Sequence, residues 1–145
     1  MKYIVLLQIF LFLSCKEFSN LDTIKDIKLI EKHQTHTSEI LVHSIANNNL
    51  DLKNIINIDC GEIESLSWNE KPSEIFNIIE ELNSEIQNEY LQKVLQNYEN
   101  TKVLINGCFY ITKNSSTTYP FFEYFVIIDK YQKKIFEVKY IGQNY

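Results

Sequence analysis

The chain has 145 residues, enough for one domain with a substantial core, and its formal net charge at pH 7 is −5. It contains 14 lysines and no arginine, the side chain best suited to gripping phosphate groups. An acidic chain without arginine is a poor nucleic-acid binder, so no nucleic-acid partner is expected. Ten acidic residues and only two lysines lie between Asp59 and Glu99. A solvated helix face and a surface for a basic protein partner both explain this concentration of charge.

Residues 1–14 have the layout of a secretory signal. Lys2 supplies a positive charge, residues 4–13 are apolar apart from Gln8, and Ser14 is a small residue at the expected cleavage point. The apolar run is shorter than the roughly 18 residues that a membrane-spanning helix requires. We therefore expect a cleaved signal peptide.

The tetrapeptide from Phe12 to Cys15 resembles the lipobox of bacterial lipoproteins. Phe12 stands where the commonest lipobox has leucine. The resemblance implies that Cys15 carries a diacylglyceryl group, that the signal is cut before it, and that the new amino terminus is acylated, with palmitate as a typical chain. We therefore expect a lipoprotein bound to membrane lipid in the bacterial cell envelope, on its periplasmic or surface side. Residues 15–20 would form a lipidated tether, and residues 21–145 a single domain.

The first part of the domain carries apolar side chains at helical spacing. A repeat of three from Leu21 to Ile30 predicts a helix over residues 22–33. Apolar residues from Ile40 to Ile45 predict a second helix, and residues 50–56 a short third one.

The strongest helix signal covers residues 73–98. Its apolar stripe shifts around the helix after Glu89, so the helix is expected to bend or to bury its two halves against different neighbours.

Beyond residue 100 the apolar period changes from that of a helix to that of a strand. Strands are predicted at residues 103–112, 121–128 and 136–140, and the second is apolar on both faces, as in a central strand. Short polar turns favour an antiparallel meander. The predicted fold class is α+β: N-terminal helices and one long helix packed on a three-stranded antiparallel meander. This order of elements resembles NTF2-like and cystatin-like proteins, in which a helix packs into a curved sheet.

Cys60 and Cys108 remain once Cys15 is assigned to the lipid. Export would place them in an oxidising compartment, which favours a disulfide between them. The alternative is a pair of buried free thiols, because the sequence does not supply the Cα separation.

Other candidate chemistry is sparse. His33, His36 and His43 lack the ligand pattern of a metal site, so no metal or other cofactor is expected. The sequence offers no catalytic constellation. The one unusual feature is a run of aromatic residues in the second predicted strand: Tyr119, Phe121, Phe122, Tyr124 and Phe125. Such a run indicates either a core strand or one face that lines a pocket or meets a protein.

These observations predict a membrane-anchored, non-catalytic protein-binding module. A concrete version is an immunity or inhibitor protein whose acidic helix meets a basic protein. The alternatives are an NTF2-like ligand-binding protein or small hydrolase with a pocket between helix and sheet, and a structural envelope subunit.

Overall fold

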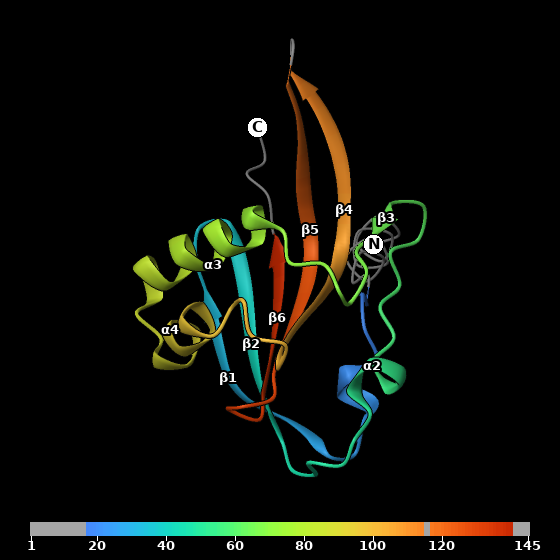
Figure 1. Cartoon of the computed structure of the whole chain (residues 1–145), viewed down its shortest axis with the longest axis vertical. Coiled ribbons are helices and arrows are strands. Elements are labelled where there is room, and N and C mark those ends of the chain that lie inside the picture. Colours follow the sequence, from blue (N-terminus) through green and yellow to red (C-terminus); the bar gives the residue numbers. More distant parts are fainter. Residues whose placement is uncertain (1–16, 115–116, 141–145) are drawn as a thin grey trace, which may run out of the picture.

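A six-stranded antiparallel sheet forms the centre of the protein (Figure 1). The structure is a computed structural model, and it describes residues 17–114 and 117–140, so the expected signal peptide and Cys15 lie outside the described residues. The strands are β1 (Ile27–Gln34), β2 (Ser38–Ile45), β3 (Glu64–Ser65), β4 (Val103–Asn114), β5 (Thr117–Asp129) and β6 (Lys134–Tyr140). Their order across the sheet is β1-β2-β6-β5-β4-β3, and all neighbours are antiparallel.

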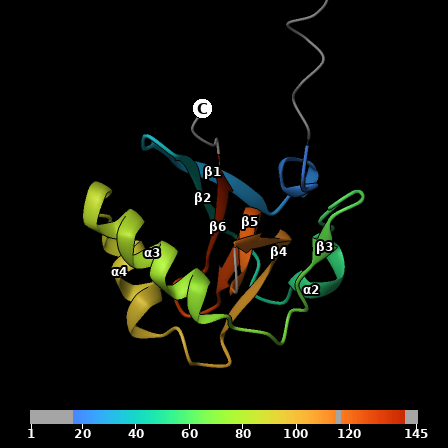
Figure 2. The same ribbon diagram turned by 90° about the horizontal axis from the view of Figure 1, so that it is seen from above.

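Helical elements cover both faces of this sheet. They are the 3₁₀ turn η1 (Leu21–Thr23), α2 (Leu52–Ile55), α3 (Ser73–Ile86) and α4 (Glu89–Gln96). Figure 2 shows α3 and α4 on one face and η1 and α2 on the other. None of the helices within the described ranges has the length and apolar character needed to cross a bilayer.

The α3–α4 layer buries the larger core. Ile75, Ile79 and Leu82 form the buried stripe of α3, as the apolar spacing of the sequence predicts, and Leu91 and Val94 continue it on α4. These side chains pack on buried sheet residues: Ile40, Val42, Val103, Ile105, Phe125, Ile127, Phe136 and Val138.

The long predicted helix is broken into two. Gln87 ends α3 in the left-handed conformation, with a φ of 50°. Asn88 then starts α4, because its side-chain oxygen accepts hydrogen bonds from the backbone N–H groups of Tyr90 and Leu91 at 3.0 and 3.2 Å. The break lies where the apolar stripe of the sequence shifts, yet both helices bury against the same face of the sheet.

A second core lies on the opposite face. Leu21, Leu52, Ile56 and Cys60 cover buried residues of the central strands: Leu104, Cys108, Tyr124, Val126, Ile128 and Ile135. The central position predicted for β5 is confirmed, since β4 and β6 flank it and its middle is buried on both faces.

The predicted fold class is wrong. The segments predicted as N-terminal helices hold two more strands, β1 and β2, and only one helical turn, α2, lies within residues 50–56. The sheet therefore has six strands in place of a three-stranded meander, and the resemblance to NTF2-like and cystatin-like layouts is not retained. The cause is that β2 is paired on both edges and buried on both faces, so its apolar residues do not alternate.

The β4–β5 hairpin extends beyond its neighbours (Figure 1). Toward the hairpin turn, the last residue pair between β3 and β4 is Glu64 with Phe109, and the last pair between β6 and β5 is Lys139 with Tyr124. Beyond these positions the two arms pair only with each other. The register shifts at the base of this extension and leaves Glu123 without an opposite residue, so Phe122 packs on the α3 side with Phe125 although they are three positions apart.

Candidate functional site

A groove lies between α3 and the base of the extended hairpin, where the ends of β2 and β6 also meet. Its volume is about 200 Å³. The described residues that line it are Thr37, Ser38, Ile78, Glu81, Leu82, Glu85, Pro120, Phe121, Phe122 and Tyr140. Four separate segments of the chain thus build one depression with an apolar floor.

Aromatic rings form one wall of the groove. Phe121 lies between two tyrosine rings, with ring-centroid distances of 4.9 Å to Tyr110 and 4.9 Å to Tyr140. Phe121 and Tyr140 line the groove and are half-buried, and Tyr110, which is 40 % exposed, adjoins Phe121 outside the groove.

The aromatic run predicted from the sequence therefore divides between two roles. Tyr124 and Phe125 are core residues, Phe121 lines the groove, and the buried Phe122 belongs to the core and also lines the groove. The side chain of Tyr119 lies outside the described part of the chain.

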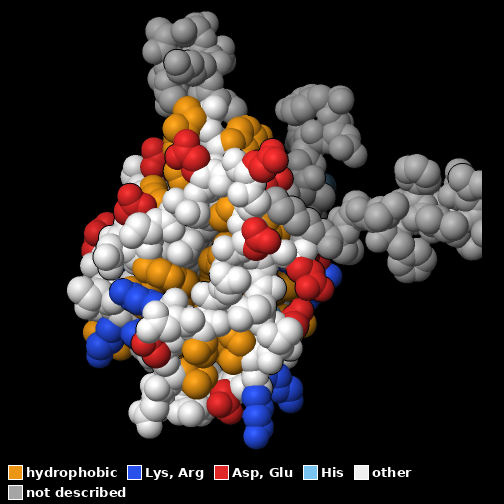
Figure 3. Space-filling model, turned by 90° about the vertical axis from the view of Figure 1, so that its right-hand side faces the viewer, with side chains coloured by type: hydrophobic (Ala, Val, Ile, Leu, Met, Phe, Trp, Pro, Cys, Tyr) orange, Lys and Arg blue, Asp and Glu red, His pale blue; other side chains and the backbone are white. Residues whose placement is uncertain are grey.

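The opposite wall of the groove is acidic. Glu81 and Glu85 stand one turn apart on α3, and both are exposed. Among the described lining residues these two carry negative charge and none carries positive charge. On the side of the molecule that carries β3, Asp and Glu side chains lie mainly in the upper part and most lysines in the lower half (Figure 3).

A buried hydroxyl group completes the groove. Ser38 is 0 % exposed, and its Oγ has no hydrogen-bond partner among the described residues. A buried hydroxyl without a partner costs free energy, and such groups are few in native proteins.

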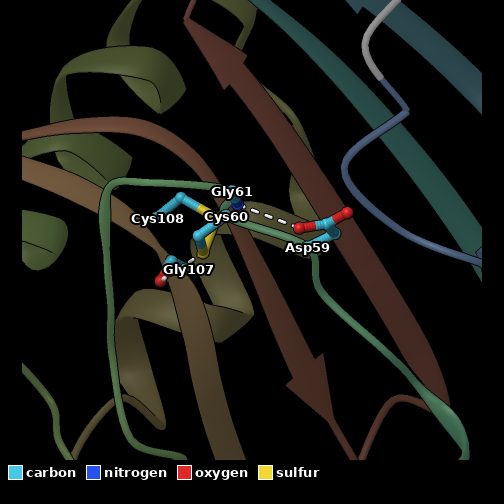
Figure 4. Close-up of a disulfide and its surroundings, with 5 residues drawn as sticks. All are labelled: Asp59, Cys60, Gly61, Gly107 and Cys108. Atoms are coloured by element: carbon cyan, nitrogen blue, oxygen red, sulfur yellow. Dashed lines mark hydrogen bonds between the residues drawn. A yellow bond between two sulfur atoms is a disulfide. The ribbon is translucent and has the colours of Figure 1, made fainter.

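The predicted disulfide between Cys60 and Cys108 is present, with a Cα separation of 5.3 Å (Figure 4). Helices α3 and α4 cover the Val103 face of β4, so the turn at residues 59–61 reaches Cys108 from the other face. Gly61 permits this turn with a φ of 62°, and its N–H donates to Asp59 Oδ1 at 2.9 Å. The Cys60 sulfur lies 3.7 Å from the Gly107 carbonyl, a contact without a proton to share because the sulfur is bridged.

The chain just after the expected lipid attachment point is fixed to the sheet. The Phe18 ring stacks on Tyr124 at a centroid distance of 4.8 Å, and Ser19 Oγ donates to Glu137 Oε1 at 2.8 Å. Asn20 is held as well, because its side chain donates to the Ile55 carbonyl at 2.8 Å. Residues 18–20, assigned to the tether from the sequence, therefore contact the domain.

Glu137 is the centre of this contact. It is 4 % exposed, and its carboxylate also accepts a hydrogen bond from the Tyr124 hydroxyl at 3.1 Å. Burial alone raises the pKa of Glu137, but hydrogen bonding from Ser19 and the neighbouring His43 and Lys139 outweigh burial and lower it. Burial raises the pKa of Tyr124, and the charge of Glu137 raises it further.

His43 contacts the same carboxylate on its other side. Its Nε2 lies 3.6 Å from Glu137 Oε2, and the imidazole is 1 % exposed. In a nucleophilic Ser-His-acid arrangement the serine hydroxyl contacts the imidazole. Here the hydroxyl of Ser19 contacts the carboxylate instead, so this geometry holds the N-terminal segment in place and does not activate Ser19.

The three histidines do not converge. His33 contacts Glu31 at 2.9 Å and Asn88 at 3.3 Å, which links β1 to the start of α4. His36 is exposed, and His43 is buried beside Glu137. Residues 17–114 and 117–140 contain no group of three or more His, Cys, Asp or Glu side chains placed to hold a metal ion.

Sequence reasoning missed Ser38, His43 and the inward position of Glu137. The only available signal was that Ser38 and His43 lie beside or within an apolar run. The partners of Glu137 come from distant parts of the chain, so the sequence did not connect them.

Comparison with protein-family models, with curated proteins and with solved structures finds no match for this chain.

Proposed function

We propose that this protein is a lipid-anchored binding protein of the bacterial cell envelope, and that its groove docks a basic protein partner. The observation that carries the proposal is the groove itself, which combines a half-buried aromatic wall with two exposed carboxylates that have no ion-pair partner within the described residues. Exposed aromatic surface is enriched at protein interfaces, and charge complementarity guides partner choice.

The contacts of Phe18 support an anchor close to the domain. Cys15 precedes Phe18 by three residues, which span at most about 10 Å when extended. Acyl chains on Cys15, at about 0.8 kcal/mol for each buried CH₂, would therefore hold the domain directly at the bilayer surface. The bridge between Cys60 and Cys108 agrees with an exported, oxidising location.

An anchor close to Phe18 would also set the direction of the groove relative to the bilayer. Phe18 lies on the sheet face that carries η1 and α2, whereas α3 covers the other face (Figure 2). A bilayer on the Phe18 side leaves the groove directed away from the membrane, where a soluble partner reaches it. An immunity or inhibitor protein, which blocks a basic toxin or enzyme at the membrane, is the concrete form of this proposal.

Capture from native membranes tests the proposal. We expect the wild-type protein to retain a basic protein that the charge-reversed Glu81→Lys/Glu85→Lys variant does not retain. The matched control is Glu74→Lys/Glu80→Lys, which changes two exposed carboxylates of α3 outside the groove and should retain the partner. Equal capture by both variants would contradict docking at the groove.

A further inference from the structure

We infer that the groove is a subsite for one cationic side chain, lysine or arginine, presented by a segment of the protein partner. The inference rests on the proposed binding function and specifies the chemistry that the groove recognises. Its volume of about 200 Å³ is below the range of roughly 300–1,000 Å³ typical of small-molecule sites. A single extended side chain with an apolar stem and a charged head matches its size and its mixed lining.

The carboxylates of Glu81 and Glu85 destabilise α3 locally. They are four residues apart on α3, a spacing at which like charges repel. Glu85 also lies in the last turn of α3, where the helix dipole disfavours negative charge, and this turn contains no basic residue. A cation bound between them relieves both effects, so this arrangement is expected of a cation subsite.

Two lysines of the described strands are engaged with another carboxylate. Lys32 forms an ion pair with Glu39, and Lys139 lies 3.8 Å from the same carboxylate. Within the described residues no ion pair reaches Glu81 or Glu85. The charge of these two residues is therefore available to a partner.

Ser38 supplies an independent polar group. Its side chain is 0 % exposed, it lines the groove, and its Oγ lacks a hydrogen-bond partner among the described residues. An ammonium or guanidinium group carries several N–H donors and would satisfy this oxygen. The hydroxyl thus gives a reason, separate from the acidic wall, to place a hydrogen-bond donor in the groove.

The aromatic wall suits the same ligand. Phe121 and Tyr140 present ring surface beside the carboxylates, and a cation is attracted to the face of such rings. The described residues include two such contacts, with Lys102 Nζ 4.3 Å from the Tyr131 ring centroid and Lys134 Nζ 5.2 Å from that of Tyr90.

Peptide binding to the full chain in zwitterionic lipid nanodiscs tests this inference, with empty nanodiscs as the blank. The probe is a fluorescent nine-residue peptide of alternating leucine and arginine. The comparison peptide carries citrulline, which keeps the shape of arginine without its charge. We expect the arginine peptide to bind at least about tenfold more tightly. Glu81→Gln/Glu85→Gln should abolish this preference, whereas Glu74→Gln/Glu80→Gln should preserve it.

Ser38→Ala separates a ligand-binding role of the hydroxyl from a structural one. Removal of an unsatisfied buried hydroxyl should leave the unfolding midpoint in urea unchanged or raise it. The same variant should weaken arginine-peptide binding about threefold to tenfold. A lower unfolding midpoint with unchanged binding would make Ser38 a structural residue and contradict its place in the subsite.

Equal affinity for the arginine and citrulline peptides would overturn the cation subsite. The proposed function would still stand if the wild-type protein captured a partner that Glu81→Lys/Glu85→Lys did not. These two substitutions would also block a partner segment that carries no charge, so loss of capture does not depend on a cationic side chain. The peptide comparison therefore tests the cation subsite, and capture from membranes tests docking at the groove.

Discussion

The hydroxyl of Ser19 donates a 2.8 Å hydrogen bond to the carboxylate of Glu137, which lies 118 positions later in the chain. This bond joins the segment next to the expected lipid to the last strand of the sheet. His43, Tyr124 and Lys139 surround the same carboxylate, so a single buried charge connects the segment that follows the expected anchor to the core.

Glu137→Gln is expected to reduce the sensitivity of the domain to acid. The folded-state pKa of Glu137 is lower than the ordinary value of 4.5, so the unfolded state takes up its proton first. The stabilisation by Glu137 is therefore present above about pH 4.5 and lost as pH falls through the lower folded-state value. Urea unfolding at pH 7 and pH 3, with exposed Glu62→Gln as control, measures the difference. A wild-type and a Glu137→Gln protein with the same loss of stability on acidification would contradict the expectation.

Removal of the disulfide by Cys60→Ala/Cys108→Ala should lower the free energy of unfolding by about 4 kcal/mol. The bridge joins residues 48 positions apart, and closing a loop of this length restricts the unfolded chain. Urea unfolding of the variant, beside wild-type protein kept oxidised or reduced, provides the measurement. If reduction and substitution both leave stability within about 1 kcal/mol of the oxidised protein, the bridge does not hold the fold together.

Phe125→Ala should destabilise the domain by roughly 3–5 kcal/mol, because Phe125 is 2 % exposed in the core beneath α3. Phe121→Ala is the matched control on the same strand, and its half-buried ring should cost much less. Thermal and urea unfolding of both variants distinguish a core position from a groove position. Similar losses at the two positions would mean that the groove wall is part of the core.

Gly107→Ala should destabilise the sheet beside the disulfide by about 1–3 kcal/mol. A Cβ at this position would lie 2.6 Å from the Cβ of Phe125 and 2.6 Å from the carbonyl oxygen of Tyr124. Neither atom is the end of a flexible side chain, so the strands have to separate. An alanine at Asn106, the neighbouring half-buried position, is the control, and equal stability of the two variants would contradict this close approach.

Helix α3 and strands β4 and β6 could be predicted because their apolar patterns are periodic. Ile75, Ile79 and Leu82 recur at helical spacing on one face of α3. In β6, Phe136 and Val138 pack on the α3–α4 side, and Ile135 packs on the other side. The disulfide partners could be named because only two cysteines remained after Cys15.

The N-terminal strands could not be predicted for two physical reasons. In β2 both faces are buried, so Ile40, Leu41 and Val42 form a continuous apolar run that fits a helix as well as a strand. In β1 the apparent helical repeat crosses from η1 into an edge strand, where Leu29 is 45 % and Ile30 41 % exposed beside a register shift.

The groove was beyond sequence reasoning because its walls come from four segments. The acidic concentration on α3 and the aromatic run in β5 were both visible, but nothing in the sequence placed Glu81 opposite Phe121. A register shift at Glu123 also changes which aromatic side chains share a face, and such a shift has no signature in the apolar pattern.

Site-specific photo-crosslinking in native membranes tests the central claim most directly. A benzophenone amino acid replaces Phe121 in the groove in one variant and exposed Thr23 on the opposite face in another. We expect a protein adduct from position 121 and a lipid adduct from position 23, since the proposed anchor would hold the η1 face at the bilayer and direct the groove outward. A lipid adduct from position 121, or protein adducts from position 23 alone, would contradict it.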